Sequence, residues 1–295
     1  MRNLLFGTLL GAAVAFSGVL SPASAQASVA ERIQQISAKY LGTPYVLDPF
    51  GEGENGKFDR DPLYRFDAFD CTTYVETMMA LALSHDGDFN EFFNTLQRIR
   101  YRDGTIGYVT RNHFPEVDWI PNNTRAGFIS DVTEAVAGPF GVQQARAVID
   151  KRSWYEHKQL DQLNVPGASR EQKELLLSEL RAEGVKYQPE LSVMPYIGID
   201  QLFPSGEPNA ELFARIPPGS VLNVVRPDWD LSGTEGTHLN VSHQALVVKK
   251  DGVLTVRHAT TGSFQRVVDQ PLAEWLHGFI GHPTIKGINL LRIRE

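Results

Sequence analysis

The residue with the most obvious chemical potential is Cys71, the single cysteine of the chain. It opens the stretch 71–83, where apolar residues recur at helical spacing and predict a core-facing stripe: Cys71, Tyr74, Val75, Met78, Met79 and Ala82. A thiol in the first turn of a helix lies among unpaired backbone N–H groups, which stabilise a thiolate and can donate to an oxyanion. Asp70, at the natural N-cap position, disfavours a second negative charge. A nucleophile here therefore needs a histidine as its base.

Two of the eight histidines are placed to supply that base. The Asp-Gly pair at 251–252 is a strong turn signal between two apolar runs. A two-residue turn there sets His258 opposite Ala245, which shares a strand face with His243. The two histidines are then predicted to be diagonal neighbours, about 7–8 Å apart at Cα. Either histidine alone is compatible with a structural role, so the prediction depends on the pair.

The elements that must position these residues follow from periodicity. Helical spacing predicts further helices at Val29–Leu41, Phe89–Ile99 and Ser169–Gly184, the last exposed and opened by a Ser-x-x-Gln capping box. Residues 46–70 are predicted to be irregular, and 112–123 to form an ordered loop. Strand patterns are confined to the C-terminal part, with one short helix among them: Val221–Val225, His243–Lys249, Val253–His258, Ile288–Ile293 and the helix Leu272–Leu276. This order predicts one α+β domain over residues 26–295, with an antiparallel sheet last and a central elaboration at 85–215.

Composition excludes several classes of protein. The 295 residues are 42% hydrophobic and 21% charged, with a net charge of -7, values that fit a globular chain. The acidic balance, without a long Lys/Arg block, argues against nucleic acid as a partner. A single cysteine excludes an intrachain disulfide.

The first 25 residues have the organisation of a signal peptide. A positive start with Arg2 precedes an apolar run, Leu4–Leu20, and the small residues at 23–25 provide a cleavage pattern. The alternative is a membrane anchor, but the run is short against the roughly 20 residues of a stable span. We therefore expect a periplasmic or secreted protein with no membrane span in the mature chain.

Two segments together resemble a known family. YLGTPYVLDP (residues 40–49) with FDCTTYVETMMALA (69–82) resembles the NlpC/P60 cysteine peptidases, which are papain-like enzymes of the cell wall. VSHQALVVKKDGVLTVRHATT (241–261) is similar to the histidine strand of that superfamily and the strand after it. The sequence DCTT and three outer motifs are typical of its N-acetylmuramoyl-L-alanine amidase-like branch: NHFPEVDWIPNN (112–123), MPYIGIDQL (194–202) and IPPGSVLNVV (216–225).

The resemblance implies a papain-like core and assigns roles to individual residues. Cys71 would be the nucleophile, His243 its general base, and His258 the residue that orients the imidazole. Tyr45 matches a tyrosine that lines the active site near the oxyanion. Further candidates for oxyanion or substrate contact follow: Asp70, Trp119, Asn122 and Ser242. One departure is that Gln244 and Ala245 follow the histidine where the family commonly has a small, Gly-containing run.

The function implied is hydrolysis of the amide between the lactyl group of N-acetylmuramic acid and L-alanine in peptidoglycan or its fragments. Two alternatives remain open, namely an endopeptidase that cuts the stem peptide after D-glutamate and a non-catalytic wall-binding module. A zinc hydrolase is disfavoured because the His-x4-His pairs at 238/243 and 277/282 lack the HExxH pattern. A serine hydrolase would need a G-x-S-x-G elbow, which is absent from the sequence. We expect no cofactor or metal, and a monomer.

Overall fold

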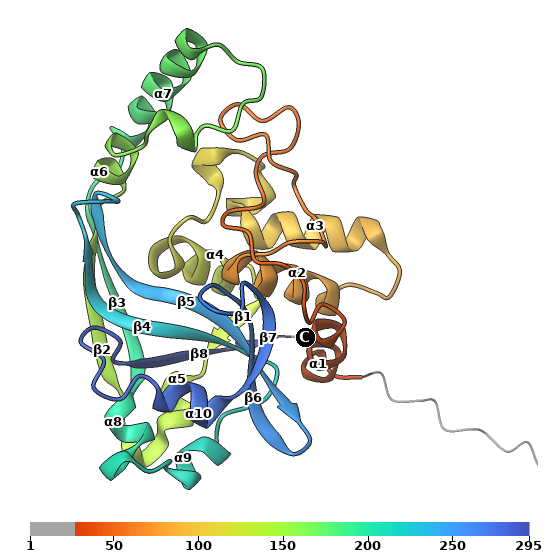
Figure 1. Cartoon of the computed structure of the whole chain (residues 1–295), viewed down its shortest axis with the longest axis vertical. Helices are drawn as coiled ribbons and strands as arrows, with labels where there is room; N and C mark the ends of the chain where they lie inside the picture. The colour runs from red at the N-terminus through yellow and green to blue at the C-terminus, as the bar shows by residue number, and fades with distance from the viewer. Residues whose placement is uncertain (1–26, 295) are drawn as a thin grey trace, which may run out of the picture.

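A computed structural model describes residues 27–294, and the predicted signal peptide lies outside them. An eight-stranded sheet forms the centre of the molecule, with the N-terminal helices on one face and short helices, including α10 (Leu272–His277), against the other (Figure 1). Every strand pairing is antiparallel. The mixed helix and antiparallel sheet architecture confirms the predicted α+β class. None of the helices within residues 27–294 combines the length and apolar character that a bilayer span requires.

The three N-terminal helices confirm the predicted helical segments. They are α1 (Val29–Ala38), α2 (Cys71–Leu83) and α3 (Phe89–Arg100). The core stripe of α2 is completely buried at Val75, Met78 and Met79, in one cluster with Leu246 and Val248 of the sheet. Each such side chain contributes about 1.5–3 kcal/mol through burial. The helix that begins with Cys71 is thus fixed against the strand that bears His243.

The sheet contains strands from both the central and the C-terminal parts of the chain. Its strand order is β2-β3-β8-β4-β5-β6-β7, and β1 pairs with β8. The bounds are β1 Ile129–Asp131, β2 Gln143–Ile149, β3 Glu190–Gly198, β4 Ser220–Leu231, β5 Thr237–Lys250, β6 Val253–Thr260, β7 Arg266–Pro271 and β8 Gly287–Ile293. The sequence predicted β4, β5, β6 and β8 but not the other four. β2 and β7 are short and rich in polar residues, and Pro195 interrupts the apolar pattern of β3.

The predicted β5–β6 hairpin is confirmed with its register. Lys250 pairs with Val253, and the pairing continues without a shift to Leu246 and Arg257. The two turn residues, at 251–252, both have positive φ, as a two-residue hairpin turn of the favoured hand requires. The histidine face of the sheet is therefore set by this turn.

The central elaboration is more regular than predicted. The remaining helices and helical turns are α4 (Ile120–Arg125), α5 (Thr133–Ala137), α6 (Lys151–Glu156), α7 (Arg170–Gly184), α8 (Ile199–Leu202), α9 (Ala210–Ala214), η1 (Arg102–Gly104), η2 (Tyr108–Thr110), η3 (Pro115–Trp119), η4 (Gly138–Phe140), η5 (Leu160–Gln162) and η6 (Pro204–Gly206). The loop predicted at 112–123 is wrong, because η3 runs directly into α4. Each of the two begins with a proline in its first two positions, where a missing N–H costs nothing.

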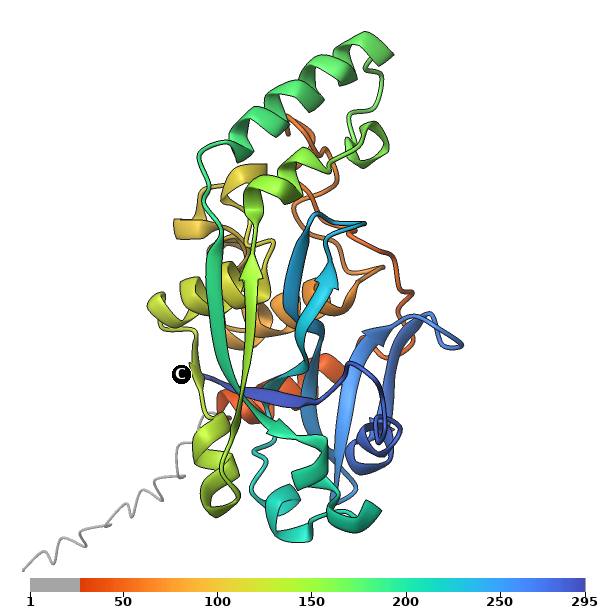
Figure 2. The same cartoon turned by 90° about the vertical axis from the view of Figure 1, so that its left-hand side faces the viewer.

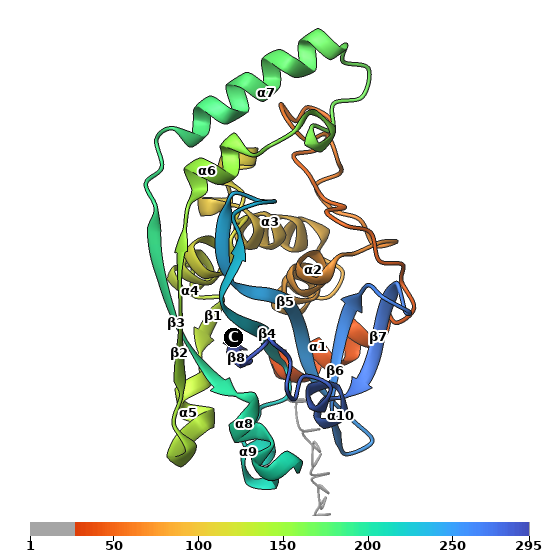
Figure 3. The same ribbon diagram turned by 60° about the vertical axis from the view of Figure 1, so that its left-hand side comes forward.

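The ribbon of β2 and β3 extends beyond the rest of the sheet and carries α6 and α7 at its end (Figure 2). Its apolar face, with Ala145 and Met194, packs on Val225 and Val241 of β4 and β5. In Figure 3 this ribbon stands beside the β4–β5 pair, on the side away from β6 and β7. The central part of the chain thereby reaches the strand segment that precedes His243. Gly184 is the last residue of α7, where a Cβ would lie 2.4 Å from Cβ of Tyr155.

Candidate active site

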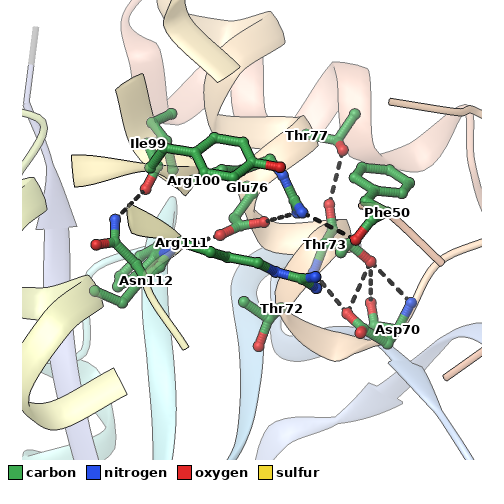
Figure 4. A network of polar contacts seen from close by, with 12 residues as sticks. Phe50, Asp70, Thr72, Thr73, Glu76, Thr77, Ile99, Arg100, Arg111 and Asn112 are labelled. Carbon is green, nitrogen blue, oxygen red and sulfur yellow. Dashed lines mark hydrogen bonds and ion pairs between the residues drawn. The ribbon is translucent and has the colours of Figure 1, made fainter. Parts of the chain in front are cut away.

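Asp70 is the N-cap of the helix that begins with Cys71. Its Oδ1 accepts hydrogen bonds from the backbone N and the hydroxyl of Thr73, both at 2.7 Å, and Thr73 accepts in return from the Asp70 backbone N–H (Figure 4). Its Oδ2 accepts from the backbone N–H of Asp48. Both carboxylate oxygens are therefore acceptors within the protein. This arrangement makes Asp70 a helix cap, and the oxyanion or substrate contact expected of it stays a prediction.

Cys71 lies where α2 meets β5. Its side chain is partly exposed, and Sγ lies 3.9 Å from the hydroxyl of Thr72. Burial, followed by the Asp70 charge, raises the pKa of the thiol to about 11, while the backbone N–H of Gln244 acts in the opposite direction. The sulfur is thus next to the residue that follows His243. Near neutral pH it is a thiol, because burial and Asp70 outweigh the helix N-terminus.

His243 and His258 form the predicted pair, and a glutamine extends it. His243 Nε2 lies 2.7 Å from His258 Nδ1, and His258 Nε2 lies 3.0 Å from Oε1 of Gln270 on β7. An amide oxygen can only accept, so His258 carries its proton on Nε2 and accepts at Nδ1. His243 then donates from Nε2, which leaves its Nδ1 with a free lone pair. This is the tautomer that a base acting on a thiol needs.

A β-bulge lies directly before His243. Val224 pairs with His243, whereas the next residue of β4, Val225, pairs with Val241, so Ser242 is an extra residue without a partner on β4. Such bulges redirect side chains and are common beside active sites. Ser242, predicted as a possible substrate contact, is the residue that makes this irregularity.

The indole ring of Trp275, in α10, packs against both histidines. Its ring centroid lies 5.2 Å from that of His258 and 6.2 Å from that of His243. Burial, together with His258, lowers the pKa of His243 to about 3, and burial also lowers the pKa of His258. Both imidazoles are neutral near pH 7. Trp275 and Gln270 could not be found from the sequence, because the short helix carries no chemical signal and β7 is not predicted.

Tyr45 lies beside the cysteine. Its backbone N–H donates to the Gln265 carbonyl, and Tyr45 forms a bridge with Phe69, two residues before Cys71. Burial, followed by the charges of Cys71 and Asp70, raises the pKa of the phenol. The hydroxyl therefore keeps its proton and can act as a donor.

The structure corrects the prediction for Trp119, while the contact expected of Asn122 stays a prediction. Trp119 is 1% exposed, and its Nε1 donates to Oε1 of Glu76 at 3.0 Å, so the indole is a core side chain and not a substrate contact. Asn122 donates to Oδ1 of Asn112 at 2.6 Å and accepts from Arg125.

A buried ion pair links Glu76, in the helix that begins with Cys71, to Arg100 at the end of α3. Glu76 Oε2 accepts from Arg100 at 2.6 Å, and Figure 4 shows Arg100 extending on to the carbonyl of Phe50. Arg111 pairs with Asp48 and with Asp59, the latter at 3.2 Å. No local pattern in the sequence reveals these ion pairs, because the partners lie 24 to 63 positions apart in the chain. Together they join α2, α3 and the irregular segment before Cys71.

Comparison with known proteins identifies the family. The chain matches the family described as AmiA-like, N-acetylmuramoyl-L-alanine amidase-like, over residues 35–281. It belongs to this family. A protein from Legionella pneumophila of known crystal structure is 38% identical, with a TM-score of 0.88, over 91% of this chain and 90% of that chain.

Further solved structures that are similar to this chain are named as amidases. A N-acetylmuramoyl-L-alanine amidase from Bacteroides uniformis is 25% identical, with a TM-score of 0.63, over 90% of this chain and 99% of that chain. No curated protein matches the chain. This member of the AmiA-like family is therefore an amidase-like hydrolase related to peptidoglycan, as the sequence predicted at that level.

Proposed function

We propose that this AmiA-like protein is an exported cysteine amidase that hydrolyses the bond between the lactyl group of N-acetylmuramic acid and L-alanine. The observation that carries the proposal is the chain from Gln270 through His258 to His243, which leaves an imidazole lone pair at the strand against which the Cys71 helix packs. Two histidines with a purely structural role would not need to lie beside a cysteine thiol. Placement in the NlpC/P60 superfamily, with a papain-like core, is part of the same proposal.

The reaction begins from neutral partners. His243 Nδ1 takes the thiol proton as the sulfur of Cys71 bonds to the lactyl carbonyl carbon, which gives a tetrahedral oxyanion. The carbon–nitrogen bond then breaks, and His243 gives its proton to the departing amine of L-alanine. Water attacks the thioester with His243 again as base, which releases the lactyl carboxylic acid and restores the thiol.

Two groups are available to stabilise the oxyanion. The backbone N–H of Cys71 belongs to the first turn of α2, whose N–H groups have no partner inside the helix. Tyr45 contributes a phenol that stays protonated beside the sulfur. Removal of one such donor typically costs 10²–10³ in turnover, about 2.7–4 kcal/mol.

Mass spectrometry of a muramyl tetrapeptide incubated with the protein tests the proposal. We expect release of the intact tetrapeptide and the free amino sugar by the wild type, and a loss of at least about 10³-fold in Cys71→Ala and His243→Ala. His85→Ala is the matched histidine control, because His85 lies on the surface with its side chain 80% exposed.

Other products would reassign the function. A dipeptide released with L-alanine still on the sugar would indicate the endopeptidase. Equal turnover by Cys71→Ala would remove the cysteine mechanism, and binding without cleavage would favour the wall-binding module. Export is tested separately, by N-terminal sequencing of protein secreted from the full-length gene, with cleavage after residue 25 as the expected result.

A further inference from the structure

Glu116 of η3 accepts two hydrogen bonds from the strand that bears His243. Its Oε1 accepts from the backbone N–H groups of Asn240 and Val241, the second at 2.6 Å. The Glu116 side chain comes from the central elaboration and is 8% exposed. A buried carboxylate thus meets β5 immediately before the bulge residue Ser242.

Successive N–H groups of a regular strand point to opposite sides, so one oxygen cannot accept from both. The β4–β5 pairing is irregular at this place. Val225 pairs with Val241 and Trp229 with Leu239, which leaves three residues of β4 opposite Asn240 alone. In a regular sheet, carbonyl groups of the neighbouring strand would accept from the N–H groups of β5. At Asn240 and Val241 the Glu116 carboxylate is the acceptor instead.

The side chain of Asn240 also stabilises this irregular part of the β4–β5 pairing. Its Oδ1 accepts from the backbone N–H of Asp228, which has positive φ, and its Nδ2 donates to the hydroxyl of Ser192 on β3. Asn240 is completely buried. The backbone at 240–241 is consequently held by β3, β4 and η3 at once.

The second carboxylate oxygen of Glu116 argues against a role in packing alone. Oε2 is buried and has no hydrogen-bond partner among the described residues. Leaving such a group unpaired is unfavourable, because its desolvation is not compensated by a hydrogen bond. An apolar side chain would avoid this cost, but it would leave the two N–H groups of β5 without an acceptor.

We infer that Glu116 is a positioning residue for His243, holding the irregular backbone of β5 so that the bulge at Ser242 directs the imidazole at Cys71. The inference rests on the proposed function, in which His243 is the base. It also gives the central elaboration a part in catalysis besides substrate contact. A misplacement of about 1 Å can cost 10²-fold in rate, so a contact at the two residues directly before the bulge is sufficient to matter.

Three substitutions of Glu116 distinguish the effect of its hydrogen-bond acceptor from the effect of its negative charge. Glu116→Gln keeps an acceptor oxygen of the same reach, Glu116→Asp withdraws the carboxylate by one methylene, and Glu116→Ala removes it. We expect kcat to fall about 10- to 100-fold in the alanine and aspartate variants, with KM within about threefold, and to stay within about fivefold of wild type in the glutamine variant. The rate of Cys71 alkylation by iodoacetamide, followed against pH, should shift in Glu116→Ala and Glu116→Asp toward the profile of His243→Ala.

Thr133→Ala is the control for a general loss of stability. Thr133 is also buried, and its hydroxyl accepts from the backbone N–H of Leu290, in another part of the sheet. At a comparable loss of Tm it should leave kcat and the alkylation profile unchanged. If Glu116→Ala does not fold, the contrast between the aspartate and glutamine variants decides.

Equal kcat values for Glu116→Asp and wild type, or equal losses in Glu116→Asp and Glu116→Gln, would overturn the inference. Failure of the proposed function has a different result. In that case His243→Ala itself would retain turnover and the wild-type alkylation profile. A large effect of His243→Ala with none from any Glu116 variant removes only the positioning role.

Discussion

His258 Nε2 lies 3.0 Å from Oε1 of Gln270, while the opposite ring nitrogen lies 2.7 Å from Nε2 of His243. Because an amide oxygen cannot donate, this one contact fixes the proton positions along the whole chain. In the proposed mechanism, the direction of proton transfer at Cys71 is thus decided two side chains away, by Gln270 of β7.

Substitution of Gln270 should change the tautomer or the pKa of the proposed base, His243, without altering Cys71. In Gln270→Leu the acceptor is lost, His258 is no longer held in one tautomer, and we expect a fall in kcat of about 10-fold or more. Gln270→Glu keeps an acceptor and adds a negative charge, which favours protonated imidazole and raises the pKa values of both histidines. The acid limb of the kcat/KM profile should therefore move to higher pH.

Arg266→Gln, at an exposed position of the same strand, is the control for these variants. Its turnover and pH profile should match the wild type. An unchanged acid limb in Gln270→Glu would show that the histidine pair does not titrate in catalysis.

Asp70→Asn should make the thiol more reactive. An asparagine remains a good N-cap for Thr73, but the negative charge that raises the pKa of Cys71 is removed. We expect alkylation at pH 8 to accelerate roughly threefold to tenfold. Asp70→Ala also removes the charge but loses the cap, at about 1 kcal/mol of stability, so the two variants separate charge from helix capping. A slower reaction in Asp70→Asn would contradict the charge assignment.

Stability should decrease in mild acid because His243 is buried in its neutral form. Its folded pKa of about 3 lies below the usual 6.5, so the unfolded chain binds the proton first. The stabilisation is complete above pH 6.5 and is lost as the pH falls toward 3, by up to about 1.4 kcal/mol per pH unit for this one group. Urea denaturation at pH 7, 6 and 5 measures the slope. His243→Gln should show a shallower decrease, and equal slopes would refute the neutral burial of this residue.

Glu76→Gln should destabilise the protein strongly. The side chains of Glu76 and Arg100 are 4% and 2% exposed, and the substitution leaves the arginine charge buried without its counter-charge. Loss of one partner of such a pair costs about 3–5 kcal/mol, which denaturant titration would detect. Glu179→Gln, which breaks the exposed pair with Lys57, should change the free energy of unfolding by less than about 1 kcal/mol. Similar losses in both variants would contradict the importance of burial.

The sequence by itself was sufficient for the features that depend on local order along the chain. Helical spacing and the cap at Asp70 predicted the helix that begins with Cys71, because both depend on residues within two turns. The turn at 251–252 determined the β5–β6 register and, through the alternation of a strand, the common face of His243 and His258. Two of the family motifs, at 69–82 and 241–261, lie in these same segments.

The tertiary structure decided what depends on partners far apart in the chain. Gln270 is linked to His258 across a strand pair that the sequence did not predict, and Glu76 holds an indole 43 positions away that had been assigned to substrate. Glu116 reaches β5 across 124 residues. A buried polar side chain is stabilised only by the partner that folding brings to it, and no local pattern specifies which partner that is. The sequence therefore determined the helix and hairpin that carry the reactive groups, while their protonation and orientation arose from the packing of the central elaboration and the last strands.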